Sequence, residues 1–132
     1  MRESFFKFKR PIVKDMNYTI SDTFRNDQKI SIDNKITTNY VKNPEERRAI
    51  VELHIELGYG KSENSPFRLS LTIIAEFQWE QDHSTEKVDI LLRQNSPALL
   101  LSYARPIVSN ITANSVMTYD IPFMDFTARK QK

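Results

Sequence analysis

The 132-residue chain has no cysteine, only two glycines and only two histidines. Without cysteine there are no disulfides, no thiolate metal ligands and no cysteine nucleophile. The two glycines, Gly58 and Gly60, are nearly adjacent, so neither a Walker A loop nor a dinucleotide-binding glycine pattern can be assembled. The composition therefore argues against nucleotide use, and we expect no ATP, no metal and no other cofactor.

Histidine and carboxylate patterns give little support for catalysis. His54 stands between Glu52 and Glu56 at alternate positions, and alternate residues project from the same face of a strand. Such a set can bind a metal ion, although a solvated or hydrogen-bonded histidine on a charged face explains it as well. No nucleophile has a base beside it in the sequence, and we expect that the protein is not an enzyme.

Charge and hydropathy argue against a nucleic-acid-binding, a membrane-spanning or an exported protein. Lysine and arginine number 19 against 17 acidic residues, so the net charge is only +2, and we interpret the basic clusters at both ends as solubilising charge and not as a nucleic-acid site. The most apolar short run, 97–101, is far shorter than the roughly 20 residues that span a bilayer. The N-terminus lacks a signal-peptide pattern. We expect a cytoplasmic protein with no membrane span and no nucleic-acid partner.

Alternation of apolar and polar residues, the pattern of strands with one buried face, is nearly unbroken in two segments, 51–59 and 67–79. At about 3.3 Å per residue the second would be about 43 Å long. The intervening loop, 58–66, is rich in turn residues, so the two segments are predicted to form an antiparallel hairpin.

Two earlier segments alternate less regularly. In the first, Phe6 to Ile20, one parity holds Phe6, Phe8, Ile12, Met16, Tyr18 and Ile20. Pro11 interrupts it, so this strand is predicted to bend there or to lie at a sheet edge. The second segment, 30–36, is short, and the residues from Thr37 to Arg48 predict a long crossover passing over one edge of the sheet.

After the fourth strand the period changes to the three- and four-residue steps of a helix. A short helix is predicted over 85–94, and Asn95-Ser96-Pro97 predicts the capped start of a second helix. That helix contains Pro106, which costs about 3 kcal/mol in a helix interior, and the tail, 119–126, must dock on the rest of the protein. Strands followed by helices predict an α+β fold, a four-stranded antiparallel sheet with C-terminal helices packed on one face.

The C-terminal part carries an ordered set of residues: a helix start, an apolar run, a Tyr-x-Arg motif and a closing segment with proline. They are Asn95, Pro97, Leu99 to Leu101, Tyr103, Arg105, Ile107, Ile111, Ile121-Pro122 and Asp125-Phe126. Near the N-terminus stand Phe6 to Arg10, Lys14-Asp15 and Tyr18. In this order the residues resemble the SecB family of protein-export chaperones over about 5–126, so 1–132 is interpreted as a single SecB-like domain.

The resemblance implies an ATP-independent chaperone, a holdase that binds unfolded polypeptide in apolar grooves and assembles as a homotetramer, a dimer of dimers. Apolar burial gives about 25 cal/mol per Å² with little side-chain selectivity, and methionine adapts to varied partners. The expected client-binding residues lie in the predicted crossover and the tail, where the tail residues could equally close the core. They are Tyr40, Val41, Ile121, Phe123, Met124 and Phe126.

SecB proteins that serve the export motor SecA carry an acidic sheet face, and this chain departs from that pattern. Asp15 matches one acidic position and is a possible SecA contact, but Thr19, Arg68 and Ser70 replace family residues that are acidic or apolar. The mixed charge predicts weak docking to a basic partner, so SecA stays an open question. Two alternatives also stay open: a dedicated chaperone of one partner, such as an antitoxin, and a structural or adaptor module that has lost the groove.

Overall fold

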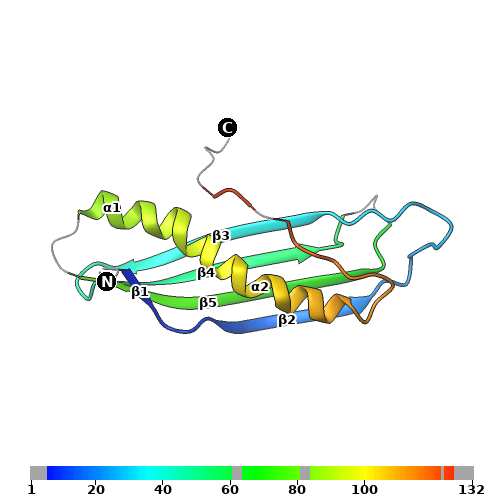
Figure 1. Ribbon diagram of the computed structural model, residues 1–132, viewed down its shortest axis with the longest axis horizontal. Coiled ribbons are helices and arrows are strands. Elements are labelled where there is room, and N and C mark those ends of the chain that lie inside the picture. Colours follow the sequence, from blue (N-terminus) through cyan, green and yellow to red (C-terminus); the bar gives the residue numbers. More distant parts are fainter. Residues whose placement is uncertain (1–5, 61–63, 81–83, 123, 127–132) are drawn as a thin grey trace, which may run out of the picture.

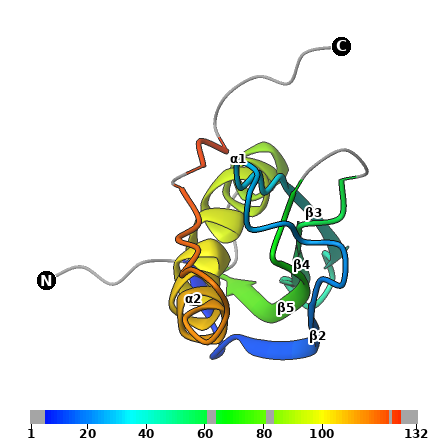
Figure 2. The same cartoon turned by 90° about the vertical axis from the view of Figure 1, so that its right-hand side faces the viewer.

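The protein consists of two layers, a sheet and a long helix laid across one of its faces (Figures 1 and 2). The computed structural model describes residues 6–60, 64–80, 84–122 and 124–126. The strands are β1 (Phe6–Phe8), β2 (Ile12–Ile20), β3 (Asn34–Asn43), β4 (Arg48–Leu57) and β5 (Phe67–Trp79). The helical segments are α1 (Thr85–Ile90), the π-helical turn η1 (Leu91–Asn95) and α2 (Ser96–Thr112). The predicted α+β class, an antiparallel sheet with helices on one face, is confirmed.

The sheet is antiparallel and has five strands instead of the predicted four, because the first segment is divided. Both β1 and β2 pair with β5, which is followed by β4 and then by β3 at the other edge. Pro11, which has no N–H to donate, lies in the break between β1 and β2. The prediction that this segment bends or lies at an edge is therefore confirmed in both respects.

The break and a bulge around Lys14 change which side chains share a face. Phe8 pairs with the buried Phe77 and faces the helix, whereas Ile12 pairs with Ile74 on the opposite face. After the register shift between Val13 and Asp15, the strand again places apolar residues on the helix side. The expectation that Ile12 shares a face with Phe8 and the later residues is wrong, since each extra residue in a bulge reverses the parity.

The crossover of this sheet lies at 21–33 and not at the predicted 37–48. The residues expected to cross over form β3 as far as Asn43, and a tight turn then leads into β4. The predicted strand residues Ile30 and Ile32 lie instead in the loop that connects β2 to β3. Tyr40 and Val41 therefore belong to an edge strand, and their assignment to a crossover was wrong.

Asn64 holds the crossover against the loop between β4 and β5. Its side-chain oxygen accepts a hydrogen bond from the Arg25 N–H at 2.9 Å, and its amide group donates to the Arg25 carbonyl at 2.8 Å. The Ser31 N–H donates to the Asn64 carbonyl at 3.0 Å. Gly58, with φ +83, donates its N–H to the Asp33 carbonyl at 3.2 Å. The hairpin loop thus also fixes the path of the crossover.

The core lies between the helix and the two central strands. α2 packs over β4 and β5, and one parity of these strands is buried from Ala49 to Leu57 and from Phe67 to Phe77, which confirms the alternation. The helix predicted over 85–94 is present as α1 and η1, and the second helix begins at Ser96 as predicted, but Asn95 makes no side-chain capping hydrogen bond because α1, η1 and α2 follow one another directly. The wide π turn precedes Pro97, whose ring would clash with the carbonyl four residues earlier in a regular helix.

Candidate functional site

The tail after α2 folds back on the helix side of the sheet (Figures 1 and 2), where the side chains of Asn34, Ser109 and Thr112 hydrogen-bond to it. The Tyr119 N–H donates to Thr112 Oγ1 at 2.8 Å, and the Tyr119 hydroxyl accepts from Asn34 Nδ2 at 2.9 Å. Ser109 Oγ donates to Asp120 Oδ1 at 2.6 Å. Ile121 follows and is fully buried in the core. The tail is docked, as predicted, and its first part completes the core.

Replacing Ile121 with alanine is expected to lower the free energy of unfolding by about 3 kcal/mol, because the truncation leaves a cavity beside the central strands. Urea unfolding at a fixed protein concentration measures it. Met124→Ala is the matched control, since the Met124 side chain is 37% exposed, and we expect a loss below about 1 kcal/mol. Equal small losses would show that the tail does not contribute to the core.

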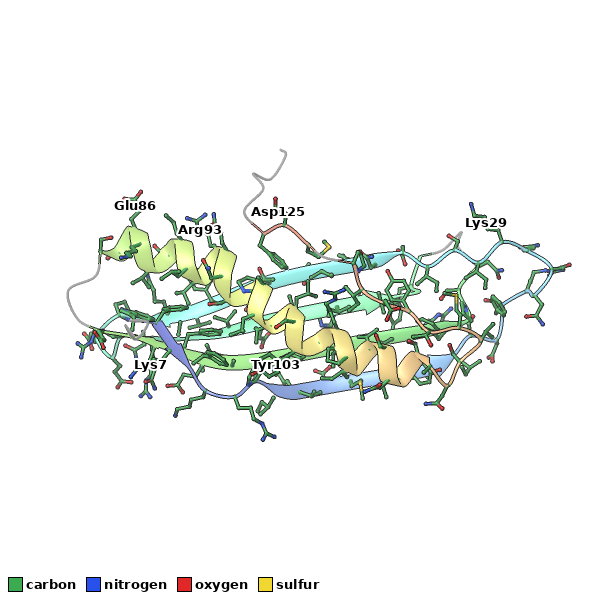
Figure 3. All side chains as sticks on the ribbon, in the orientation of Figure 1. Lys7, Lys29, Glu86, Arg93, Tyr103 and Asp125 are labelled. Atoms are coloured by element: carbon green, nitrogen blue, oxygen red, sulfur yellow. The ribbon has the colours of Figure 1, made fainter. Side chains whose placement is uncertain are left out.

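Beyond Ile121 the tail and α2 together form a small pocket of about 130 Å³, lined by Ala98, Leu101, Ser102, Arg105 and Met124. The Ser102 hydroxyl already donates to the Leu99 carbonyl at 2.6 Å, so it adds little free polarity to the lining. The pocket lies on the side of α2 that faces the tail. Asp125, which is labelled in Figure 3, belongs to the later part of this tail. The pocket is suited to an apolar side chain.

The structure brings only some of the predicted client-binding residues together. Met124 lines the pocket, and Phe126 is half-buried against the core. Ile121 lies inside the core and is not at the surface in this conformation. Phe123 lies outside the described residues. The helix residues of the pocket were not predicted from the sequence, because Ala98 and Leu101 look like core residues of the helix and Ser102 and Arg105 carry no apolar signal.

Tyr40 and Val41 face opposite sides of β3. Tyr40 pairs with the buried Val51 and is half-buried on the helix side, whereas Val41 pairs with Ile50 and is 73% exposed on the other face. The two side chains do not line the same groove. On its helix side β3 also carries Lys42, whose Nζ lies 2.6 Å from Asp89 Oδ1.

β2 forms an apolar, unprotected sheet edge. Val13, Met16 and Ile20 face the helix side, yet they are 43%, 43% and 56% exposed, because α2 packs over β4 and β5 instead. The Ser21 N–H donates to the Pro66 carbonyl. Since backbone groups alternate in direction along an antiparallel strand, Met16, Tyr18 and Ile20 point their N–H and C=O groups away from β5. Within the described part of the chain, the edge thus combines a row of backbone groups that no second strand pairs with and exposed apolar side chains.

The sheet face opposite the helix carries mixed charge arranged in ion pairs. Lys14 Nζ lies 2.8 Å from Glu52 Oε2, and Glu76 lies 3.3 Å from Arg48 Nη1 and 3.7 Å from Lys9 Nζ. The hydrogen bond to Glu52 raises the pKa of Lys14. A hydrogen bond from Gln78 lowers the pKa of Glu76.

Two further predicted features lie on this open face. Asp15, the possible SecA contact, is exposed there and pairs with Thr72. His54 Nδ1 lies 2.7 Å from Thr72 Oγ1 and Nε2 lies 3.1 Å from Glu56 Oε2, the geometry of a hydrogen-bonded histidine. Among the described residues, no group of three histidine, aspartate or glutamate side chains is placed to hold a metal ion.

Other proteins share this fold and part of this sequence. The uncharacterized protein MJ0357 of Methanocaldococcus jannaschii is 32% identical over 112 residues, which are 83% of this chain and 71% of that protein. The solved Mycobacterium tuberculosis Rv1957 SecB-like chaperone, in complex with a ChAD peptide from the Rv1956 HigA1 antitoxin, superimposes with a TM-score of 0.73. The alignment covers 96% of this chain and 93% of that one at 12% identity, so the fold is SecB-like. No protein-family model matches the chain. In the described segments, no helix is long and apolar enough to cross a membrane.

Proposed function

The chain belongs to the same family as the Methanocaldococcus jannaschii protein MJ0357, and we propose that it is an ATP-independent chaperone that holds unfolded polypeptide. The observation that carries the proposal is the SecB-like arrangement of one antiparallel sheet and one long helix, with exposed apolar side chains on the helix side. Extended polypeptide binds such surfaces by apolar burial with little selectivity for sequence.

The proposed client surface is the pocket between α2 and the tail, with its apolar surroundings. Leu101 and Met124 supply apolar lining, and Met124 is both flexible and partly exposed, which suits a surface that accepts varied side chains. Phe126 and Tyr40 are half-buried on the same side of the sheet. A client segment inserts an apolar side chain into the pocket and extends along the helix.

The proposed assembly surface is the edge strand β2. A second copy pairs its own β2 antiparallel to the first, so that both rows of free backbone groups gain partners and Met16 and Ile20 become covered. The other edge strand is less suited to this pairing, because its exposed side chains from Lys35 to Asn39 are polar, so that covering them buries less apolar surface than covering Met16 and Ile20. Two such dimers form the proposed tetramer, which offers several client surfaces to one chain. The cytoplasmic location and the role in protein export stay predictions from the sequence.

A dedicated chaperone of a single partner is the second candidate function. The observation that favours it is the fold shared with Rv1957, a SecB-like chaperone solved with an antitoxin peptide. The mixed charge of the open face also gives little support for docking to a basic SecA segment. A dedicated chaperone would co-purify from its own host with one protein and would not protect unrelated clients.

An aggregation assay tests the chaperone proposal. A chemically unfolded model client, diluted into buffer without ATP, is expected to scatter less than half as much light when one tetramer per client is present. Met124→Asp is expected to weaken this suppression several-fold, because a carboxylate replaces an apolar pocket wall. Val116→Asp, at a 59% exposed site in the loop after α2, is the matched control and should protect like the unmodified protein. If the protein did not suppress the aggregation of unrelated clients, the proposal of a general holdase would be wrong.

A further inference from the structure

The open face of the sheet carries four aliphatic residues at positions where alternation calls for polar ones. Val41 on β3, Ile50 on β4, Ile74 on β5 and Ile12 on β2 all lie on this face, as their pairing shows. Three of them are exposed, at 73%, 42% and 54% for Val41, Ile50 and Ile12, and Ile74 is half-buried. We call these four residues the aliphatic stripe.

The stripe is continuous across the sheet. Val41 is directly opposite Ile50, and Ile12 is directly opposite Ile74. Ile50 pairs with Glu76, two residues from Ile74, so the two isoleucines are diagonal neighbours. Directly opposed side chains are about 5 Å apart and diagonal ones about 7 Å, which gives a row of roughly 17 Å. Four apolar residues spaced three or four apart along three turns of an α-helix span a similar length.

The hydrogen bonding of the sheet backbone determines which kind of partner can bind to the open face. The inner strands already use their N–H and C=O groups within the sheet, so the face offers side chains only. An extended chain laid across it would gain no backbone hydrogen bonds from the sheet. A helix satisfies its backbone internally and can present one apolar row, so a helix fits this surface better than an extended client.

The exposed area of the stripe and the charges beside it further restrict the kind of partner that can bind there. Four side chains expose at most a few hundred Å², less than the roughly 800 Å² that each partner buries in a stable interface, so the stripe is too small for a second copy to pack on it face to face. The stripe is flanked by the pairs Lys14–Glu52 and Arg48–Glu76, at 2.8 and 3.3 Å. Because these charges are already neutralised, the surface favours a partner without strong net charge.

We propose that the aliphatic stripe docks an uncharged amphipathic helix of a partner protein, at a site separate from the client surface. The two sites lie on opposite faces of the sheet, so the protein can hold a client on the helix side while a partner is bound on the open face.

A designed peptide tests this proposal. The probe is a helical 15-residue peptide with leucine at four positions spaced as in the stripe and equal numbers of lysine and glutamate elsewhere. Methyl NMR of the protein is expected to show shifts confined to the stripe, with a dissociation constant of tens of micromolar. Ile50→Thr is expected to weaken binding at least tenfold. Ile90→Thr, in α1 and 38% exposed, is the matched control and should bind normally.

Several results would overturn the proposal. Equal binding of a peptide with the same composition and scrambled leucines, or of one made non-helical by two prolines, would show that no helical row is recognised. Shifts on the helix side, an unchanged affinity of Ile50→Thr or no binding at all would remove the site. A smaller assembly for Ile50→Thr in light scattering would show that a second copy covers the stripe. Val41→Thr, at the more exposed edge position, replaces Ile50→Thr if that variant does not fold.

Discussion

Gly58→Ala is expected to lower the free energy of unfolding by about 3 kcal/mol. Gly58 has φ +83, a conformation in which a side chain costs about 1–2 kcal/mol. A Cβ at this position would lie 2.1 Å from the Phe67 carbonyl oxygen and 2.7 Å from Ser65 Oγ. The carbonyl belongs to the first residue of the central strand β5, so the overlap can be relieved only by moving backbone, which adds a cost of similar size.

Gly60→Ala is the control for this prediction. Gly60 lies two residues further along the same loop and is only half-buried, so its replacement is expected to change stability by less than about 1 kcal/mol. Urea unfolding followed by circular dichroism measures both variants, at one protein concentration because assembly affects the apparent stability. If Gly58→Ala were as stable as the unmodified protein, the path of the loop described here would be wrong.

Lysine at both Met16 and Ile20 is expected to break the β2–β2 pairs of the proposed assembly and so to lower its mass. Both side chains are exposed on the edge strand, and their backbone groups point away from β5. In a β2–β2 pair the two copies place these lysines close together, where like charges repel. We expect the dissociation constant to rise at least about 100-fold, which corresponds to roughly 2.7 kcal/mol.

Light scattering after size-exclusion chromatography measures the mass of this double variant. Val116→Lys adds a positive charge at a site of similar exposure away from the sheet edge, and it should assemble like the unmodified protein. The double variant should keep its fold, because neither side chain belongs to the core. An unmodified protein that is already a single chain, or a double variant that assembles normally, would contradict the proposed edge pairing.

The strongly alternating strands could be predicted from sequence because their two faces meet different environments. In β5, every second side chain from Phe67 to Phe77 is buried against the helix. The residues of the buried face are therefore apolar and most of those on the other face are polar, and this difference can be read from the sequence. β3 gives no such signal, because its helix side is only half-buried and carries polar residues such as Asn34 and Lys42, and its Thr37-Thr38-Asn39 run shows no apolar period. The predicted crossover was placed there for that reason.

The surfaces were harder to predict than the core, because exposure depends on where the helix lies. Met16 and Ile20 have the parity of core residues and are exposed only because α2 covers β4 and β5 instead of β2. Ile121 was predicted as a client contact, yet it is inside the core, since apolar residues in a tail indicate docking without revealing its depth. Ile50 and Ile74 did leave a signal, as apolar residues at polar positions of regular strands.

Native mass spectrometry of the protein with a permanently unfolded polypeptide tests the proposed chaperone role most directly. The unfolded form is a reduced and alkylated disulfide protein, the control is the same protein with its disulfides intact, and no ATP is present. We expect a tetramer that carries one unfolded chain and does not bind the folded one. A protein that binds neither form, or binds both equally, would contradict a role in holding unfolded polypeptide.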